Sequence, residues 1–163
     1  LEPETTMGPM ANVRFANVVR NQIINAIKDG ATAHIDATSF PQDKDAYLMP
    51  QILTNVTHNM DIMCEESFGP VVGIMSVKDD AEAVMLMNDS KFGLTASIWT
   101  RDQERAEKIA DQIETGTVFM NRADYLDPGL CWTGCKDTGR GGGLSVIGYH
   151  NLTRPKSYHL KKL

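Results

Sequence analysis

The sequence predicts an α/β fold, in which a mostly parallel sheet lies between layers of helices as a three-layer sandwich. Apolar runs at 71–77, 94–100 and 117–120 each fit a buried strand, and the two segments between them have helical periodicity. Strands joined by helical connections of about a dozen residues run parallel, through right-handed crossovers. Because parallel strands are usually covered on both faces, we expect helices on each side of this sheet.

The first expected element is a helix over residues 12–28. Its apolar residues recur at spacings of three and four, at Ala16, Val19, Ile23, Ala26 and Ile27. Gly30 stands where a left-handed C-cap belongs. Two extended segments follow, at 31–35 and at 47–56, and the second contains Pro50, which cannot donate a hydrogen bond to a central ladder.

Two further helices are expected between the three apolar runs. Asp79 with Glu82 three residues later forms a capping box for the first, which runs to about Ser90. The second starts at Asp102 and ends at Thr115 and Gly116. Each helix therefore fills one crossover between predicted strands.

The end of the chain has a different pattern. Residues 137–143 are too rich in glycine for the interior of an element, and we expect a loop there. Residues 155–163 alternate apolar and polar side chains, which predicts an exposed strand. An exposed terminal strand offers unpaired backbone groups to a second chain, so we expect a homo-oligomer formed through it.

Composition excludes several classes of partner. The 163 residues carry a net charge of -5 with scattered basic residues, which argues against binding of nucleic acid. No apolar run approaches the ~18 residues of a membrane-spanning helix. The three cysteines, an odd number at irregular spacing, favour free thiols in a reducing compartment. We therefore expect a cytoplasmic protein without a membrane partner.

The segment around Cys64 raises the question of a catalytic thiol. Adjacent carboxylates raise the pKa of a thiol, so Glu65 and Glu66 disfavour a nucleophile, and we interpret Cys64 as structural. Glu66 and Phe68 suggest another chemistry, because a carboxylate can accept both hydroxyls of a ribose and an aromatic ring can support a flat heterocycle. The alternative is a surface acidic turn with Phe68 in the core.

Two other motifs do not predict a site. Cys131 and Cys135 have a spacing found in zinc sites, but no second cysteine or histidine pair completes a ligand set, so we expect no metal. The glycines at 139–143 fit no phosphate-binding spacing and do not follow a predicted strand.

Several motifs, in this order, resemble the C-terminal part of the NAD(P)-dependent aldehyde dehydrogenases. The most specific is "EESFGPV" at 65–71, which matches "EE-FGPV" of that family. The other matching stretches are "TMGPM" at 6–10, "YLMPQIL" at 47–53, "FGLTAS" at 92–97 and "GTVFMN" at 116–121. The resemblance covers nearly the whole chain.

This resemblance implies roles for individual residues. Glu66 is expected to hold the nicotinamide ribose of NAD or NADP, and Phe68 to lie beside the nicotinamide, while Cys64 has no catalytic role. Residues 131–141 resemble the family's "PFGG-k-SG-G" only in part: Trp132 takes the place of the phenylalanine and keeps an aromatic wall near the aldehyde. Thr133 and Cys135 depart from that pattern and leave the size of the aldehyde open.

The resemblance also implies that residues 1–150 are the C-terminal portion of a catalytic domain and 151–163 an oligomerisation tail. The family's nucleophilic cysteine, which forms a thiohemiacetal and then a thioester, and its glutamate base precede the matched region. The chain begins at Leu1 rather than methionine, so we expect that its beginning is missing and that this chain alone has no catalytic residues and no activity. The alternatives are a free-standing, non-catalytic assembly module and an acyl-phosphate reductase of the same superfamily.

Overall fold

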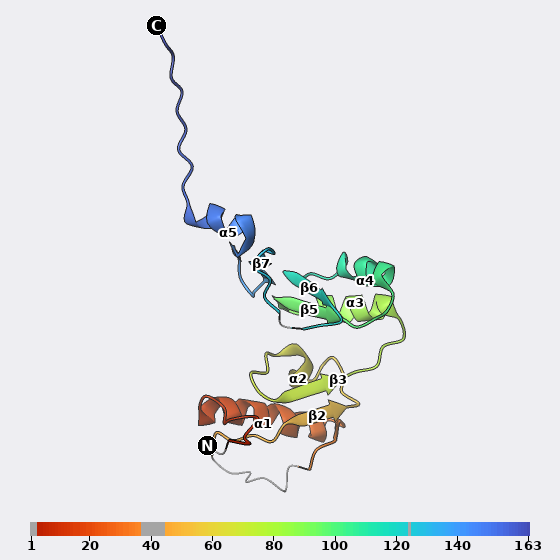
Figure 1. The fold of residues 1–163 in the computed structure, drawn as a ribbon. Coiled ribbons are helices and arrows are strands. Elements are labelled where there is room, and N and C mark those ends of the chain that lie inside the picture. The colour runs from red at the N-terminus through yellow and green to blue at the C-terminus, as the bar shows by residue number, and fades with distance from the viewer. Residues whose placement is uncertain (1–2, 37–44, 124) are drawn as a thin grey trace. The chain divides into compact units, whose positions relative to one another are not determined.

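The computed structural model describes residues 3–36, 45–123 and 125–163, and the chain divides into two compact units, Leu1–Val77 and Lys78–Leu163 (Figure 1). Leu1 and Glu2, on which the expected start of the chain falls, lie outside the described residues. Among the described residues, no helix combines the length and apolarity that crossing a membrane requires.

The described residues of the first unit form a three-stranded mixed sheet and two helices. Its elements are α1 (Val13–Lys28), β1 (Thr32–Ala33), β2 (Gln51–Thr54), α2 (Asp61–Cys64) and β3 (Val71–Ile74). The strand order is β1-β2-β3, with β1 antiparallel to β2 and β2 parallel to β3. The register places Gln51 beside Val71 and Thr54 beside Ile74.

Helix α1 confirms the predicted helix and both of its ends. The Asn12 side chain accepts a hydrogen bond of 2.9 Å from the Phe15 backbone N–H, which satisfies one of the free donors of the first turn. Gly30, just beyond the last turn, has φ +106°, a conformation that glycine adopts without a steric penalty. The buried stripe of the helix consists of Ala16, Val19, Gln22 and Ala26.

The core of this unit lies on one face of the sheet. It is formed by Ala26, Ala31, Leu53, Val56, Met60 and Ile62, so α1, β2 and α2 all contribute to it. On the opposite face Ile52, Val72 and Ile74 are exposed. The described part of this unit therefore has two layers instead of the expected three.

The buried Gln51 side chain joins the segment after β1 to β2. Its Oε1 accepts hydrogen bonds from the backbone N–H groups of His34 and Ile35 at 3.1 and 3.0 Å, and its Nε2 donates to the Ile35 carbonyl at 2.8 Å. The Gln51 backbone N–H donates to the Pro70 carbonyl at 2.8 Å. One residue thus fixes both neighbours of the central strand.

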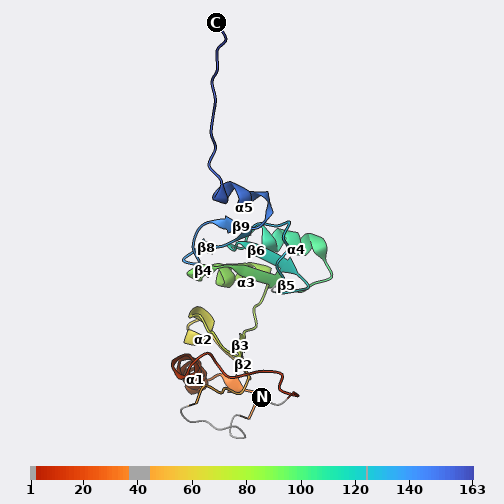
Figure 2. The same cartoon turned by 60° about the vertical axis from the view of Figure 1, so that its left-hand side comes forward.

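In the second unit, the part of the chain that the structure describes forms three small two-stranded sheets and three helices. Its elements are α3 (Asp80–Asn88), β4 (Phe92–Gly93), β5 (Thr95–Ile98), α4 (Gln103–Ala110), β6 (Thr117–Met120), β7 (Trp132–Thr133), β8 (Cys135–Lys136), β9 (Gly142–Gly143) and α5 (Ser145–Leu152). Strands β5 and β6, which flank α4 in the sequence, run parallel as predicted (Figure 2). Strands β4 and β8 form an antiparallel pair, and so do β7 and β9.

The expected single sheet of three parallel strands is corrected by these pairings. The run at 71–77 forms β3, which pairs with β2, while the runs at 94–100 and 117–120 form β5 and β6 and pair with each other. The parallel pairing of β5 with β6 was predicted correctly, whereas the β2–β3 pair was not predicted. The choice of partner for β3 was wrong because strand pairing is set by contacts distant in sequence, which local periodicity does not encode.

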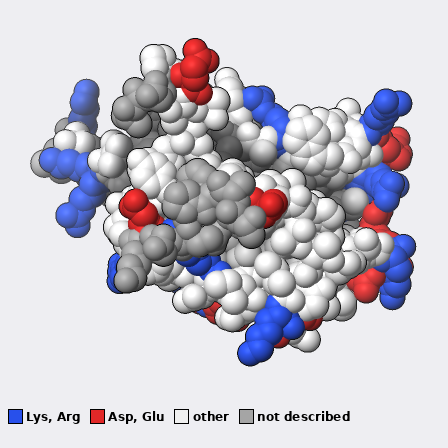
Figure 3. Space-filling view, turned by 90° about the horizontal axis from the view of Figure 1, so that it is seen from below, with Lys and Arg blue, Asp and Glu red and all other residues white. Residues whose placement is uncertain are grey.

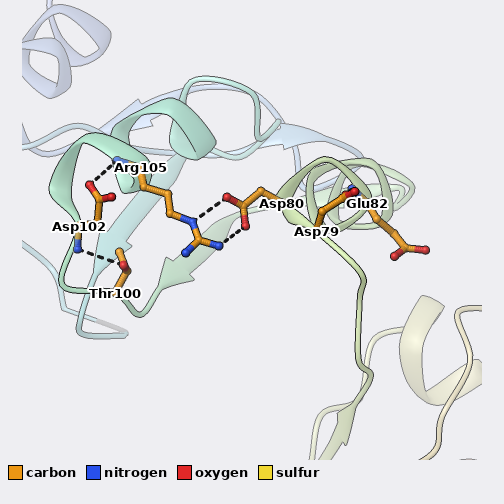
Figure 4. Close-up of polar contacts among 6 residues, drawn as sticks. All are labelled: Asp79, Asp80, Glu82, Thr100, Asp102 and Arg105. Carbon is orange, nitrogen blue, oxygen red and sulfur yellow. Dashed lines mark hydrogen bonds and ion pairs between the residues drawn. The ribbon is translucent and has the colours of Figure 1, made fainter.

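The first turns of α3 and α4 are joined by an ion pair (Figure 4). Arg105 donates from Nε and Nη2 to the two carboxylate oxygens of Asp80, at 2.7 and 2.6 Å. This hydrogen bonding lowers the pKa of Asp80 and raises the pKa of Arg105. The predicted capping box is also present, with Asp79 accepting from the Glu82 N–H at 2.9 Å and Glu82 accepting from the Lys78 N–H at 2.7 Å.

The terminal strand predicted at 155–163 is not present. After α5 the chain continues to Leu163 without regular secondary structure (Figures 1 and 2). Its side chains are exposed. A strand is defined by hydrogen bonds to a neighbouring strand, and the described residues supply none to this segment. The alternating pattern alone therefore does not produce a strand here.

The substitution Asp80→Asn is expected to lower the urea midpoint of the second unit at pH 7, because it removes the charge from the pair with Arg105. The pKa of Asp80 is lower in the folded than in the unfolded chain, so its stabilisation is present above the unfolded value of about 3.9 and is lost as the pH falls through the folded pKa. Both tryptophans, Trp99 and Trp132, lie in this unit, and their emission reports its unfolding.

The exposed Asp137 offers a matched control, Asp137→Asn, which should leave the midpoint almost unchanged. The difference in urea midpoint between the parent chain and Asp80→Asn should also become smaller in about 1 M salt, since exposed charges are then screened. If this difference in midpoint stays constant from pH 7 to below the folded pKa of Asp80, the role given to the ion pair is wrong.

Candidate functional site

The segment between α2 and β3 carries the two residues singled out for cofactor binding. The Glu65 backbone N–H donates to the Asp61 carbonyl at 2.8 Å and ends α2. Pro70 accepts a hydrogen bond from Gln51 at the first position of the parallel ladder. Residues 65–70 are thus tied at one end to a helix and at the other to the central strand.

Glu66 and Phe68 line one cavity of about 740 Å³. The remaining lining residues come from the start of the chain and from α1, and they are Pro9, Met10, Ala11, Phe15, Val18 and Val19. Phe68 is 74% exposed, which rules out the alternative that its ring is part of the core. Glu66 and Phe68 therefore face the same cavity, and their role in cofactor binding stays a prediction.

The chemistry of this cavity is a single carboxylate among apolar and aromatic walls. Glu66 is exposed, and the described residues supply neither a hydrogen bond nor an ion pair to its carboxylate. Both of its oxygens are thus available to two hydroxyl donors of a ligand. The volume lies within the range of about 300–1,000 Å³ typical of small-molecule sites.

Sequence reasoning did not identify the apolar walls of this cavity. Phe15 and Val18 lie on α1 and are 40% and 47% exposed. The helical periodicity separates the buried stripe from the other positions, but it gives no indication that a loop some fifty residues later in the sequence lies beside them. The sequence gives only one sign of Phe15 and Val18: large apolar residues occupy α1 outside its buried stripe.

Cys64 has the surroundings of a structural thiol. It is half-buried at the end of α2, and its Sγ donates to the Met60 carbonyl at 3.3 Å. All three cysteines are free. Among the residues that the structure describes, no group of three or more histidine, cysteine or acidic side chains is arranged to hold a metal ion.

Trp132 lies in the second unit, and its backbone is closely supported there. It faces Gly143 across the β7–β9 ladder, and the Thr133 hydroxyl donates to the Gly141 carbonyl at 2.6 Å. A Cβ on Gly116 would collide with the Thr133 carbonyl oxygen and lie 2.9 Å from the Gly134 nitrogen. The backbone after β7 therefore packs directly on a glycine at the entrance to β6.

Charged side chains give no continuous positive surface on the face drawn in Figure 3. Lysine and arginine side chains are scattered there among acidic and uncharged ones. The charge pattern thus contributes no second candidate site on that face.

Residues 1–158 match the family model described as the aldehyde dehydrogenase family, and the chain belongs to this family. It is 34% identical over 95% of its length to succinate-semialdehyde dehydrogenase [NADP(+)] of Deinococcus radiodurans. Its structure is similar to succinic semialdehyde dehydrogenase from Streptococcus pyogenes in complex with NADP+, with a TM-score of 0.81, 34% identity and 91% of the chain covered. The NAD+ complex of aldehyde dehydrogenase from Bacillus cereus gives a TM-score of 0.84, 31% identity and 94% coverage.

These relatives establish the α/β fold and the scale of the match. The chain spans about a third of their length: 32% of the Deinococcus and Streptococcus proteins and 31% of the Bacillus protein. The fold class predicted from the sequence is thus confirmed at the level of an α/β protein of this family.

The substitution Gly116→Ala is expected to destabilise the second unit by about 1–3 kcal/mol, the usual cost of inserting a methyl group where there is no room. The new Cβ would push back the Thr133 and Gly134 backbone, and with it Trp132. In a Trp99→Phe background, the emission of Trp132 should shift to longer wavelength and the urea midpoint should fall.

Gly8→Ala is the matched control, because a Cβ at Gly8 would meet nothing within 4 Å. It should leave both the emission and the midpoint unchanged. A Gly116→Ala chain with the same Trp132 emission and midpoint as the parent would show that this close approach is absent.

Proposed function

We propose that this chain forms part of an NAD(P)-dependent aldehyde dehydrogenase, an oxidoreductase that oxidises an aldehyde to a carboxylic acid. One observation carries the proposal: in a chain of this family, an exposed aromatic ring and a carboxylate with no partner among the described residues line the same cavity. The bound nicotinamide supplies the hydride acceptor for the oxidation. The residues of this chain bind and orient it.

Glu66 and Phe68 divide the binding between them in this proposal. The Glu66 carboxylate accepts hydrogen bonds from both hydroxyls of the nicotinamide ribose, and the Phe68 ring supports the flat nicotinamide. Once a nucleoside occupies the cavity, the apolar walls from α1 limit the access of water to the carboxylate, which strengthens its hydrogen bonds. Binding of the ribose by Glu66 is favoured because no described residue competes for its carboxylate.

Trp132 is assigned to the aldehyde side of the reaction. Its indole provides an aromatic wall, and its position is supported by the β7–β9 ladder and the close contact at Gly116. The side chains at 133 and 135 differ from the family pattern that the sequence otherwise follows, so we assign no particular aldehyde.

The nucleophile and the general base belong to the rest of the protein in this proposal. The Cys64 thiol donates a hydrogen bond to the carbonyl of Met60, the residue before its helix, and no described acid or base activates it. The three free thiols also favour a reducing compartment such as the cytoplasm. The 163-residue chain alone is accordingly expected to be inactive.

A second role for the chain, assembly, is favoured by its uncovered tail. Residues 153–163 carry exposed apolar side chains, among them Tyr158 and Leu160, which are 71% and 85% exposed. We assign this segment to pairing with a second copy of the protein, where it would gain the hydrogen-bond partners that a strand requires. A chain that assembles in this way without taking part in catalysis is the alternative function.

In the full-length protein that carries this chain, Glu66→Gln is expected to raise the KM for NAD(P)+ by about 10-fold to 100-fold, because hydrogen bonds to a charged acceptor are worth roughly 1.5–3 kcal/mol. The aldehyde KM should change much less. Steady-state kinetics with each substrate varied in turn measure both.

Glu104→Gln, an exposed glutamate of α4, is the matched control and should leave both KM values unchanged. If Glu66→Gln has the same cofactor KM as the parent, the role given to this carboxylate is wrong.

The purified 163-residue chain should form no NADH or NADPH from aldehyde and NAD(P)+, since it lacks the nucleophile. The full-length protein should form it under the same conditions, and absorbance of the reduced nicotinamide measures both. Turnover by the chain alone would contradict the division of roles, and an inactive full-length protein would favour the assembly function.

A further inference from the structure

We propose that Ser67 and Gln22 are positioning residues that hold Glu66 and Phe68 in the orientation that binds the nicotinamide nucleoside. The inference rests on the proposed function of this cavity and adds two residues that do not line it. Their hydrogen bond fixes the loop that carries the binding residues to the helix that forms the apolar wall.

The alternation of side chains along the loop is the first observation. Glu66 and Phe68 are exposed and line the cavity, whereas Ser67 between them is half-buried and does not. This alternation of exposure is the one found along an extended chain, where neighbouring side chains point to opposite sides. Whatever holds Ser67 therefore sets the direction of both binding residues at once.

The partner of Ser67 is a buried polar residue of α1. The Ser67 hydroxyl donates to Oε1 of Gln22 at 2.8 Å, and Gln22 is 6% exposed. The other buried positions of this helix, Ala16, Val19 and Ala26, are apolar. A buried amide oxygen without a partner costs about 1–3 kcal/mol, so the pair favours the loop position that satisfies it.

A second contact holds the loop against the same face of the helix. A Cβ on Gly69 would lie 2.8 Å from Cγ2 of Val19 and 3.3 Å from Cε of Met10. The loop backbone therefore lies directly on the Val19 side chain. Val19 and Gln22 are three residues apart and share a helix face. Ser67 and Gly69, two residues apart, are their counterparts on the loop.

Two contacts on one rigid helix remove the freedom of a short loop to turn. A binding carboxylate that is already aimed loses less conformational entropy when the ligand arrives, which improves affinity without any contact to the ligand. The helix that Gln22 fixes to the loop also supplies Phe15 and Val18 to the cavity. The hydrogen bond thus sets the distance between the carboxylate and the apolar wall.

The test uses the full-length protein that carries this chain, with the variants Ser67→Ala and Gln22→Met. Each should weaken binding of NADH or NADPH by about 3-fold to 10-fold, the range of one hydrogen bond, as measured by fluorescence titration. The cofactor KM should rise in parallel, while the aldehyde KM stays the same. A loss of folded protein would instead lower kcat and leave the cofactor Kd unchanged.

Three comparisons make the outcome specific. Ser67→Thr keeps the hydroxyl and should retain most of the cofactor affinity. The double variant Ser67→Ala/Gln22→Met should have a cofactor Kd no higher than that of the single variant with the higher Kd. Gln103→Met, on the exposed surface of α4, is the control for loss of a glutamine and should not change the Kd. Hydrogen exchange of residues 65–70 without cofactor should be faster in Ser67→Ala than in the parent.

The results separate this inference from the function on which it rests. If Glu66→Gln leaves the cofactor Kd unchanged, the proposed function is wrong. If Glu66→Gln weakens binding but Ser67→Ala does not, or the two single effects multiply in the double variant, the positioning role is wrong. Should Gln22→Met fail to fold, the comparison of Ser67→Ala with Ser67→Thr decides alone.

Discussion

The pairing of β2 with β3, held at its first position by Gln51, is the constraint on which the first unit depends. The backbone of Gln51 fixes Pro70, and its buried side chain fixes residues 34 and 35 on the other side of the strand. With residues 51 and 71 side by side, the chain between them must leave β2 and return to it. Helix α2 and the loop with Glu66 and Phe68 occupy that return path, and the loop meets α1.

Local features of this fold could be predicted from the sequence, whereas partnerships could not. The apolar stripe of α1, the glycine after it and the capping box at Asp79 act within a few residues, and the structure has all of them. The choice of β2 as partner of β3 depends on the buried Gln51 and on core packing distant in sequence. The alternation at 155–163 describes a strand that lacks a partner among the described residues.

The same distinction applies to the candidate site. Glu66 and Phe68 could be proposed as one candidate site because both residues lie in a single short segment, where their chemistry and spacing can be read directly. Phe15 and Val18 could not, since they join the cavity only through the approach of the loop to α1. Gln22 interrupts the apolar pattern of a buried helix face, and a polar residue at such a position is the local sign of a specific partner. Trp132 was singled out through resemblance alone.

The exposed sheet face formed by Ile52, Val72 and Ile74 has a practical consequence for handling the molecule. Burying apolar surface contributes about 25 cal/mol of free energy per square ångström. At high concentration this exposed face therefore favours self-association and adsorption to other apolar surfaces, including chromatography resin. Since successive side chains of a strand face opposite ways, threonine at 72 or 74 would make this surface more wettable while leaving Leu53 and its neighbours undisturbed.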